Sequence, residues 1–395
     1  MKKNVLFRSG SLRMGGLERV LIEVLQTIDK EKYNISLMID DDCGEGNIFE
    51  KDIPREIKYY FLKSQDLIKK TEYYKEKRKN IFCKLMYNLY MNLETFIMCR
   101  ESRKILKKIG EIDVLIDFDA GASKYIDKIS AKKKIVWIHN SIPKLKKKKS
   151  KIERFGKRLE KYDKVVAICD EMKKELQEIY PKIKEKIIRI YNPFNFERIE
   201  KLKKDDTDLT DNDKKLLGKK YIVAIARLDS VQKDFSTLIK AFKIVKEKGM
   251  EEKLYIIGDG PSKKEIEQEI KKIGLEKEIL LLGNRKNPYI WLKNSLFFVH
   301  SSKYEGLPTV LIEALICNKM IISSNCPTGP KEILNNESCG ELFEVGNYHQ
   351  LADLLEKYLI DKERNNKFLQ EILKRKEDFN KEKIIKEYEN LIDSI

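Results

Sequence analysis

The sequence predicts an α/β protein built from two Rossmann-like, doubly wound domains that face a central cleft. Short apolar runs recur along the chain, and such runs are typical of strands buried on both faces of a parallel sheet. Helical patterns separate them, such as the apolar stripe at i, i+3 and i+4 spacing from Leu17 to Ile28. The alternation stops once, in a polar stretch over Phe196–Lys220, which we interpret as a linker between domains.

The predicted strands fall into two sets, one on each side of this stretch. The first set is Asn4–Phe7, Ile35–Ile39, Val114–Phe118, Ile135–Ile138, Val165–Ile168 and Ile187–Ile190. The second is Tyr221–Ile225, Lys253–Ile257, Ile279–Leu282, Leu296–His300 and Met320–Ser323. We therefore expect an N-terminal domain over residues 1–198 and a C-terminal domain over 199–380. The helical pattern of residues 381–395 is expected to pack back on the first domain.

Composition and charge narrow the class of protein. The chain has 395 residues, of which 42% are hydrophobic, and a net charge of +17, which favours anionic partners. Seven cysteines without C-x-x-C spacing argue against a zinc site and against a disulfide framework. The N-terminal apolar run is too short for a signal peptide, and no apolar run is long enough to span a bilayer. We therefore expect a cytoplasmic protein.

Two glycines, Gly15 and Gly16, follow the first predicted strand and open a helix. Glycines let a ligand approach the backbone, and a helix N-terminus offers free N–H groups to an anion. The alternative is a flexible loop before an ordinary helix. The segment lacks the G-x-G-x-x-G pattern, so no nicotinamide cofactor is indicated.

Two cations follow the strand Tyr221–Ile225. Arg227 and Lys233 are suited to grip a diphosphate, Arg as a planar fork and Lys as a point charge. Solvated surface charge is the alternative for each of them. Gly258 begins a tight turn, Gly-Asp-Gly-Pro, after the next strand, where it lies under a nucleotide or only reverses the chain.

The most informative motif is Glu-Gly-Leu-Pro-Thr-Val-Leu-Ile-Glu over Glu305–Glu313. Pro308 suits a helix start, so Glu305 is expected in the loop and Glu313 about one turn into the helix. Carboxylates are good acceptors for sugar and ribose hydroxyls, and Gly306 exposes backbone amides to phosphate. The alternative is a buried Glu that pairs with a neighbouring Lys.

Two features of the first domain add to this pattern. His139 follows the strand Ile135–Ile138 and is expected to point into the cleft, where it contacts a sugar or acts on a proton. A hydrogen-bonded structural histidine is the alternative. Asp117 and Asp119 match a D-x-D metal pattern, but they end a strand away from the other motifs, so we favour a structural or acceptor-side role.

In this order, the motifs resemble glycosyltransferase family 4, the group 1 glycosyltransferases of the GT-B fold. By this resemblance, the first domain binds the acceptor and the second binds the donor. Arg227 and Lys233 bind the donor diphosphate, Glu305 holds hydroxyls of the donor sugar, and Glu313 holds the ribose. The resemblance adds these expected contacts: the backbone of Gly306, Leu307 and Pro308 near the sugar and phosphates, Gly15 and Gly16 in the glycine-rich loop, and His139 as the cleft histidine. Residues Leu12–Met14, just before the two glycines, depart from the family pattern.

The resemblance implies a retaining transfer of a hexose or N-acetylhexosamine from a nucleotide diphosphate sugar, with uridine expected as the base. It implies no metal and no cofactor. The segment Asn325–Glu332 is similar to members that build surface polysaccharides and lipid-linked glycans, so a lipid-linked or oligosaccharide acceptor is expected. Glu305, Arg227, Lys233 and His139 are the expected catalytic residues. An epimerase of the same fold, acting on the donor alone, is the alternative.

Basic residues gather in the first domain. Residues 51–110 carry 16 Lys and Arg against 7 Asp and Glu, and 144–158 carry nine basic residues against Glu153. Phe82, Leu85, Met86, Leu89, Leu93, Phe96 and Ile97 form one apolar helical face. This combination suits peripheral binding to an anionic membrane, while a core-facing helix with solvated lysines is the alternative. No nucleic-acid motif or stacking platform accompanies the charge, so we expect no nucleic-acid partner.

Overall fold

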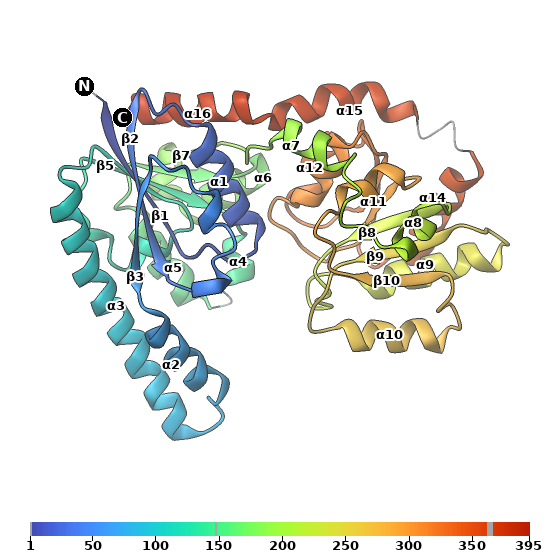
Figure 1. The fold of residues 1–395 in the computed structure, drawn as a ribbon, viewed down its shortest axis with the longest axis horizontal. Coiled ribbons are helices and arrows are strands. Elements are labelled where there is room, and N and C mark those ends of the chain that lie inside the picture. The colour runs from blue at the N-terminus through green and yellow to red at the C-terminus, as the bar shows by residue number, and fades with distance from the viewer. Residues whose placement is uncertain (1, 147, 362–365) are drawn as a thin grey trace. The chain divides into compact units, whose positions relative to one another are not determined.

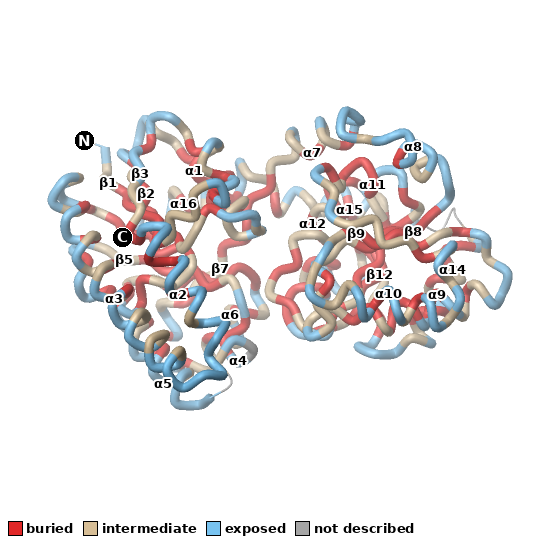
Figure 2. The backbone as a smooth tube through the Cα atoms, turned by 60° about the horizontal axis from the view of Figure 1, so that its bottom comes forward, coloured by how far each residue is buried: buried red, intermediate tan, exposed pale blue. Residues whose placement is uncertain are grey.

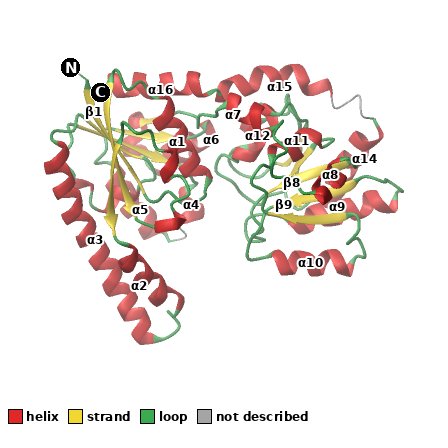
Figure 3. Ribbon diagram, viewed as in Figure 1, coloured by secondary structure: helices red, strands yellow, loops and turns green. Residues whose placement is uncertain are grey.

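A computed structural model describes residues 2–146, 148–361 and 366–395 (Figure 1). The chain forms two units, unit 1 from Met1–Phe194 with Lys381–Ile395 and unit 2 from Asn195–Asn380. The division thus falls at 194/195, close to the predicted 198/199. Each unit has its own parallel sheet with helices on both faces (Figure 3).

Unit 1 contains a seven-stranded parallel sheet in the order β3-β2-β1-β4-β5-β6-β7. Its strands are β1 (Lys3–Ser9), β2 (Tyr33–Asp41), β3 (Lys58–Lys63), β4 (Val114–Asp117), β5 (Lys133–Ile138), β6 (Lys164–Ala167) and β7 (Ile187–Arg189). The strand order reverses between β1 and β4, and ligands of such sheets bind at the carboxyl ends on either side of the reversal. The loops after β1 and β4 therefore meet at the expected ligand-binding edge.

Unit 2 contains a six-stranded sheet in the order β10-β9-β8-β11-β12-β13, also parallel. Its strands are β8 (Tyr221–Ile225), β9 (Lys253–Ile257), β10 (Ile279–Gly283), β11 (Phe298–His300), β12 (Ile321–Ser324) and β13 (Glu341–Phe343). Here the order reverses between β8 and β11. The loops that carry Arg227 and Glu305 follow these two strands, so the topology brings them to one edge.

The helices of unit 1 are α1 (Gly16–Thr27), α2 (Gln65–Glu76), α3 (Ile81–Ile109), α4 (Ile142–Leu145), α5 (Lys149–Leu159), α6 (Asp170–Ile179) and α16 (Lys381–Asp393). Those of unit 2 are α7 (Phe196–Leu202), α8 (Asp211–Leu217), α9 (Phe235–Glu247), α10 (Lys263–Lys272), α11 (Tyr289–Asn294), α12 (Thr309–Ile316), α13 (Pro330–Ile333), α14 (Tyr348–Ile360) and α15 (Leu369–Lys376). Among the described helices, none is both long enough and apolar enough to cross a membrane. Buried residues follow the strands through the centre of each unit (Figure 2).

The polar stretch 196–220, predicted as a linker between domains, is folded into one of them. It belongs to unit 2 and forms α7 and α8. The Asn195 side chain caps α7, and Thr210 and Asp213 form a capping box on α8. These caps satisfy the free N–H groups at each helix start, which explains how so polar a stretch becomes ordered.

The C-terminal helix α16 belongs to unit 1, although it follows unit 2 in sequence. The backbone N–H of Lys381 donates to Phe194 O at 3.1 Å. This bond ties the start of the helix to the last residue of the N-terminal segment of unit 1. Tyr388 is fully buried and stacks on Trp137 of β5 with ring centroids 4.7 Å apart. The apolar face predicted over 381–395 therefore completes the core of unit 1.

Candidate active site

Two loops of unit 2 are joined by backbone hydrogen bonds at the point where the strand order reverses. Asp234 N–H donates to Ser301 O at 3.0 Å, and Lys303 N–H donates to Gln232 O at 2.8 Å. Lys233 and Ser302 thus form an antiparallel bridge between the loop after β8 and the loop after β11. This pairing fixes where the side chain of Lys233 emerges relative to the second loop.

Glu305 is the centre of the polar contacts at this point. Its Oε1 forms an ion pair with Lys233 Nζ, and its Oε2 accepts from Gln232 Nε2 at 3.1 Å. The carboxylate is buried, which by itself raises its pKa, but the hydrogen bond from His300 and the charge of Lys233 outweigh burial and lower the pKa to about 2. Glu305 therefore stays ionised at neutral pH in a place shielded from water.

His300, at the end of β11, is a hydrogen-bond partner of Glu305. Its Nε2 lies 3.2 Å from Glu305 Oε1, and its Nδ1 lies 3.0 Å from Ser323 Oγ. Burial lowers the pKa of His300 despite the neighbouring carboxylate, so the ring is neutral and, when protonated on Nε2, donates to Glu305. Neither His300 nor Gln232 is among the site residues that the sequence predicts. His300 could have been found from its position, because it is a polar residue at the end of an apolar strand and lies shortly before Glu305.

The backbone from Gly306 to Pro308 is held by a tight turn over Pro327–Gly329. Glu305 N–H donates to Pro327 O at 3.2 Å, and Thr328 Oγ1 donates to Glu305 O. Gly329 has φ +96°, and a Cβ there would lie 2.7 Å from Gly306 O, so only glycine fits this approach. Leu307 and Pro308 are buried, and α12 begins at Thr309 without a side-chain cap. Its free N–H groups suit an anion such as phosphate.

The other predicted donor residues lie at the same edge of the sheet but outside the Glu305 cluster. Glu313 lies in α12 and accepts from the hydroxyl of Tyr289 at 3.1 Å. Arg227 is exposed directly after β8, and no carboxylate of the described ranges pairs with it. Gly258 has φ +142°, and a Cβ there would lie 1.9 Å from Ala226 O, so this glycine lets its turn pack against the Arg227 loop.

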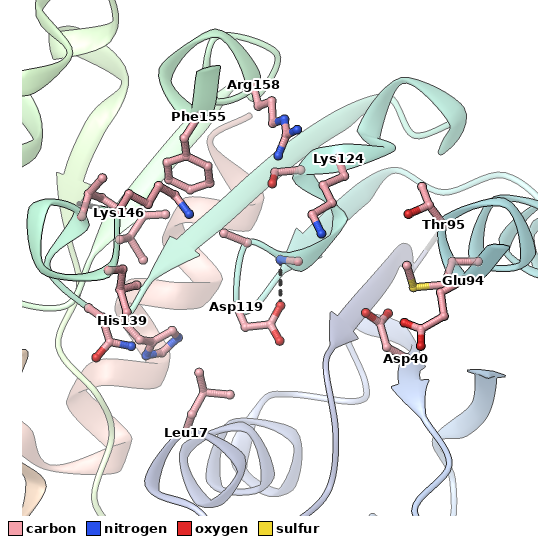
Figure 4. Close-up of a pocket in the computed structure, with 18 of the residues that line it drawn as sticks. Leu17, Asp40, Glu94, Thr95, Asp119, Lys124, His139, Lys146, Phe155 and Arg158 are labelled. Carbon is pink, nitrogen blue, oxygen red and sulfur yellow. Dashed lines mark hydrogen bonds between the residues drawn. The ribbon is translucent and has the colours of Figure 1, made fainter. Parts of the chain in front are cut away.

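The remaining predicted residues belong to unit 1. Gly15 is the N-cap of α1 and Gly16 its first residue. A Cβ on Gly15 would lie 2.3 Å from Glu18 Oε2, so a larger residue there would displace the Glu18 side chain. His139 follows β5 and lines a cavity of about 410 Å³, together with Asp119 and Leu17 (Figure 4). Burial lowers the pKa of His139 to about 4, which leaves the imidazole neutral, and its Nε2 is buried without a hydrogen-bond partner among the described residues.

The D-x-D pair proves to be part of a buried ion-pair cluster. Asp117 pairs with Arg8 at 3.1 Å and accepts from the hydroxyl of Tyr162 at 2.6 Å, and Asp119 also pairs with Arg8. Asp40 is the third carboxylate on Arg8. Their contacts give the two aspartates a structural role, and Asp119 also faces the cavity. The described ranges contain no group of three or more His, Cys, Asp or Glu side chains that could hold a metal ion.

Comparisons with known proteins agree with this geometry. Residues 206–375 match the family described as Glycosyl transferases group 1. An uncharacterized glycosyltransferase of Methanocaldococcus jannaschii is 31% identical over 58% of this chain and 63% of its own length. The N-acetylgalactosamine-N,N'-diacetylbacillosaminyl-diphospho-undecaprenol 4-alpha-N-acetylgalactosaminyltransferase of Campylobacter jejuni is 31% identical over 50% of this chain and 51% of its own.

These alignments therefore span from about half to less than two thirds of the relatives' lengths. A solved structure, Anabaena HepE in complex with UDP, superposes on all of both chains with a TM-score of 0.76 at 16% identity. That likeness concerns the fold, and it extends over both units. The chain therefore has the GT-B fold over both units, and its residues 206–375 match the group 1 glycosyltransferases.

Proposed function

We propose that the chain is a retaining glycosyltransferase that moves a hexose or N-acetylhexosamine from a UDP-sugar to a lipid-linked or cell-surface saccharide. The proposal rests above all on the buried, ionised Glu305 held by Lys233 and His300. A carboxylate fixed in this way can bind sugar hydroxyls at low cost in reorganisation. The UDP complex of Anabaena HepE and the glycan-building activity in the Campylobacter relative's name support the same donor and pathway class.

The leaving group is a nucleoside diphosphate. It gains negative charge as the bond between the anomeric carbon of the donor sugar and the phosphate oxygen breaks. Arg227, Lys233 and the uncapped N-terminus of α12 can stabilise this charge, so we propose that no metal ion is required. Glu305 is engaged by Lys233, Gln232 and His300, so it is better placed to hold hydroxyls than to attack the sugar. We therefore propose a front-side displacement in which a leaving phosphate oxygen takes the acceptor proton.

The hairpin of α2 and α3 supports a membrane-bound acceptor. The apolar stripe on α3 is solvent-exposed rather than core-facing: Phe82, Leu85 and Phe96 are 63%, 63% and 64% exposed, and Leu89 and Leu93 are also exposed. Met86 and Ile97 are half-buried. The stripe continues over several turns of a helix that projects from the sheet of unit 1 (Figure 3). An exposed apolar stripe of this kind marks an interaction surface.

The charge around this stripe favours an anionic lipid surface over a second protein. Lys75, Lys77, Arg78 and Lys79 cluster at the turn between α2 and α3, and Lys84 follows on α3. Exposed aliphatic and aromatic side chains beside lysines suit the interface of an anionic bilayer, at about 1 kcal/mol for each basic residue near the lipid. We propose that this hairpin holds unit 1 on the membrane that carries the acceptor.

A donor screen tests the enzymatic proposal. The purified chain is incubated with a panel of sugar nucleotides, with and without membrane-derived lipid-linked acceptors, and released nucleoside diphosphate is measured. We expect release to depend on a UDP-sugar and to continue in EDTA, with the anomeric configuration retained in the product. Epimerisation of the donor alone would favour the epimerase instead. Failure to turn over any sugar nucleotide under all these conditions would rule out the proposal.

A further inference from the structure

The cavity of unit 1 contains three cations that lack an acidic partner. Lys124, Lys146 and Arg158 line it, from the end of the 3₁₀ turn Gly121–Lys124, the residue after α4 and the last turn of α5. Figure 4 shows their charged groups along one side of the cavity, with Leu17 across from them. Within the described ranges, none of the three forms an ion pair. Two of them belong to the basic segment 144–158, for which the sequence leaves a membrane surface and solvated lysines as alternatives.

The carboxylates that line the same cavity are paired with other cations. Asp40 and Asp119 are both paired with Arg8. Glu94 is paired with Lys63 at 3.0 Å. Asp40 and Asp119 thus share Arg8, and Glu94 is held by Lys63, so none of these carboxylates is an ion-pair partner of Lys124, Lys146 or Arg158.

Lys146 shows that the three charges affect one another. Its Nζ lies 4.6 Å from the ring centroid of Phe155, which holds it in the cavity. Partial burial lowers the pKa of Lys146, and the charges of Arg158, Lys124 and Lys151 lower it further. Like charges gathered in a partly buried place repel, and a bound anion removes that repulsion. Arg and Lys together are typical of phosphate recognition.

A second, independent feature of the cavity indicates a ligand with a hydroxyl group. The Nε2 of His139 is buried and has no hydrogen-bond partner among the described residues, and the neutral ring can accept a hydrogen bond there. Met91, Met98 and Phe155 give the cavity apolar walls. A volume of about 410 Å³ lies within the range of small-molecule sites.

We propose that Lys124, Lys146 and Arg158 bind a phosphate or diphosphate group of the acceptor, while His139 accepts a hydrogen bond from a hydroxyl of the same molecule. The inference rests on the proposed transferase function and narrows the acceptor to a phosphate-bearing saccharide. Its source is either a sugar linked to a prenyl diphosphate or a soluble sugar phosphate.

Binding measurements test this site without turnover. The full chain carrying Arg227→Ala, which weakens the donor site, is titrated at physiological salt with geranyl diphosphate, glucose 1-phosphate and inorganic diphosphate. The test variant adds Lys124→Ala, Lys146→Ala and Arg158→Ala. The matched control adds Lys128→Ala, Lys149→Ala and Lys157→Ala, which remove the same charge from exposed positions nearby. We expect the test variant to bind the preferred probe at least about tenfold more weakly and the control to stay within about twofold.

The single variants Lys124→Ala and Arg158→Ala keep the test valid if the triple variant does not fold, with an expected loss of about threefold or more each. Preference for geranyl diphosphate identifies a lipid-linked acceptor, and preference for glucose 1-phosphate a soluble one. Equal weakening in test and control variants, or no binding of any probe, overturns the inference. Binding of UDP to the chain without Arg227→Ala reports separately on the donor site, so failure of one proposal is distinguishable from failure of the other.

Discussion

Lys233 and Glu305 form a buried ion pair that spans 72 residues of sequence, with side chains 12% and 7% exposed. The partner loops are joined by backbone hydrogen bonds, so the pair is fixed before any ligand binds. The pair therefore offers a donor two groups that are in direct contact with each other. Lys233 is a cation for the phosphates, and Glu305 is a carboxylate for the sugar hydroxyls. Such preorganisation is a main source of electrostatic catalysis.

Removing the charge of Glu305 tests its role in holding the sugar. We expect Glu305→Gln to lower kcat by about 10²-fold or more, because the amide cannot replace both the ion pair and the acceptor geometry. The affinity for UDP, which lacks the sugar, should change by less than about threefold. Steady-state kinetics and UDP titration check this, with Glu344→Gln at an exposed position as control. A kcat within about threefold of the parent would refute the assignment.

Alanine substitutions at Arg227 and Lys233 should affect different properties, UDP binding in the first case and stability in the second. Arg227 is exposed and unpaired in the described ranges, so Arg227→Ala should weaken UDP binding about tenfold with no change in the free energy of unfolding. Lys233→Ala leaves the buried carboxylate of Glu305 unbalanced and should lower the free energy of unfolding by about 3 kcal/mol. Urea unfolding and UDP titration distinguish the two, with Lys219→Ala as the control for loss of an exposed cation. Equal stability losses at 227 and 233 would contradict the geometry.

The pKa of Glu305 gives stability a definite pH dependence. Its folded pKa, about 2, lies below the value of 4.5 for an unperturbed Glu, so the unfolded state binds more protons between these values. The contribution of Glu305 is therefore present above pH 4.5 and is lost as the pH falls toward 2. The stability difference between the parent and Glu305→Gln should shrink by about 2 kcal/mol from pH 5 to pH 3. A difference that stays constant over this range would show that the carboxylate is not held as described.

The positions of the strands are easier to predict from the sequence than the contacts between side chains. Every predicted strand is present within a few residues, because strands buried on both faces are apolar throughout. The two missed strands, β3 and β13, lie at sheet edges, where partial exposure removes that signal. Of the four side chains predicted to surround one sugar, Lys233 and Glu305 are in contact, whereas Arg227 and Glu313 lie outside this cluster. The partners of Arg8, a charged residue inside β1, lie up to 111 residues away and leave no local pattern.

The site itself was predicted unevenly for a similar reason. Glu305–Pro308 forms one contiguous motif, so its residues could be assigned together. His300 and Gln232 act on Glu305 through pairings that depend on the register of two loops, which no single sequence reveals. The exposure of the α3 stripe was also open, because an apolar helical face fits a core and a membrane surface equally well.

Tyr388 should stabilise unit 1 from the far end of the chain. It is fully buried on α16 and stacks on Trp137, which in turn stacks on Phe118 with centroids 6.1 Å apart. We expect Tyr388→Ala to lower the free energy of unfolding by about 3–5 kcal/mol, because it leaves a cavity in the core beside Trp137. Lys386→Ala, on the exposed face of the same helix, is the control and should cost less than about 0.5 kcal/mol. Denaturant unfolding followed by fluorescence measures both, and similar midpoints would exclude this packing role.

The exposed stripe of α3 should bind anionic vesicles through both apolar and charged contacts. We expect the parent to float with phosphatidylglycerol-containing liposomes at low salt and to bind less as salt rises, because screening weakens the lysine contribution. Phe82→Ser, Leu85→Ser and Leu89→Ser together should abolish flotation without lowering stability, since all three side chains are exposed. Ile360→Ser, at a 65% exposed position of α14, controls for loss of an exposed apolar side chain and should float like the parent. If the triple variant still floats, the membrane contact lies elsewhere. If the parent self-associates and the triple variant does not, the partner of this face is a second copy of the chain.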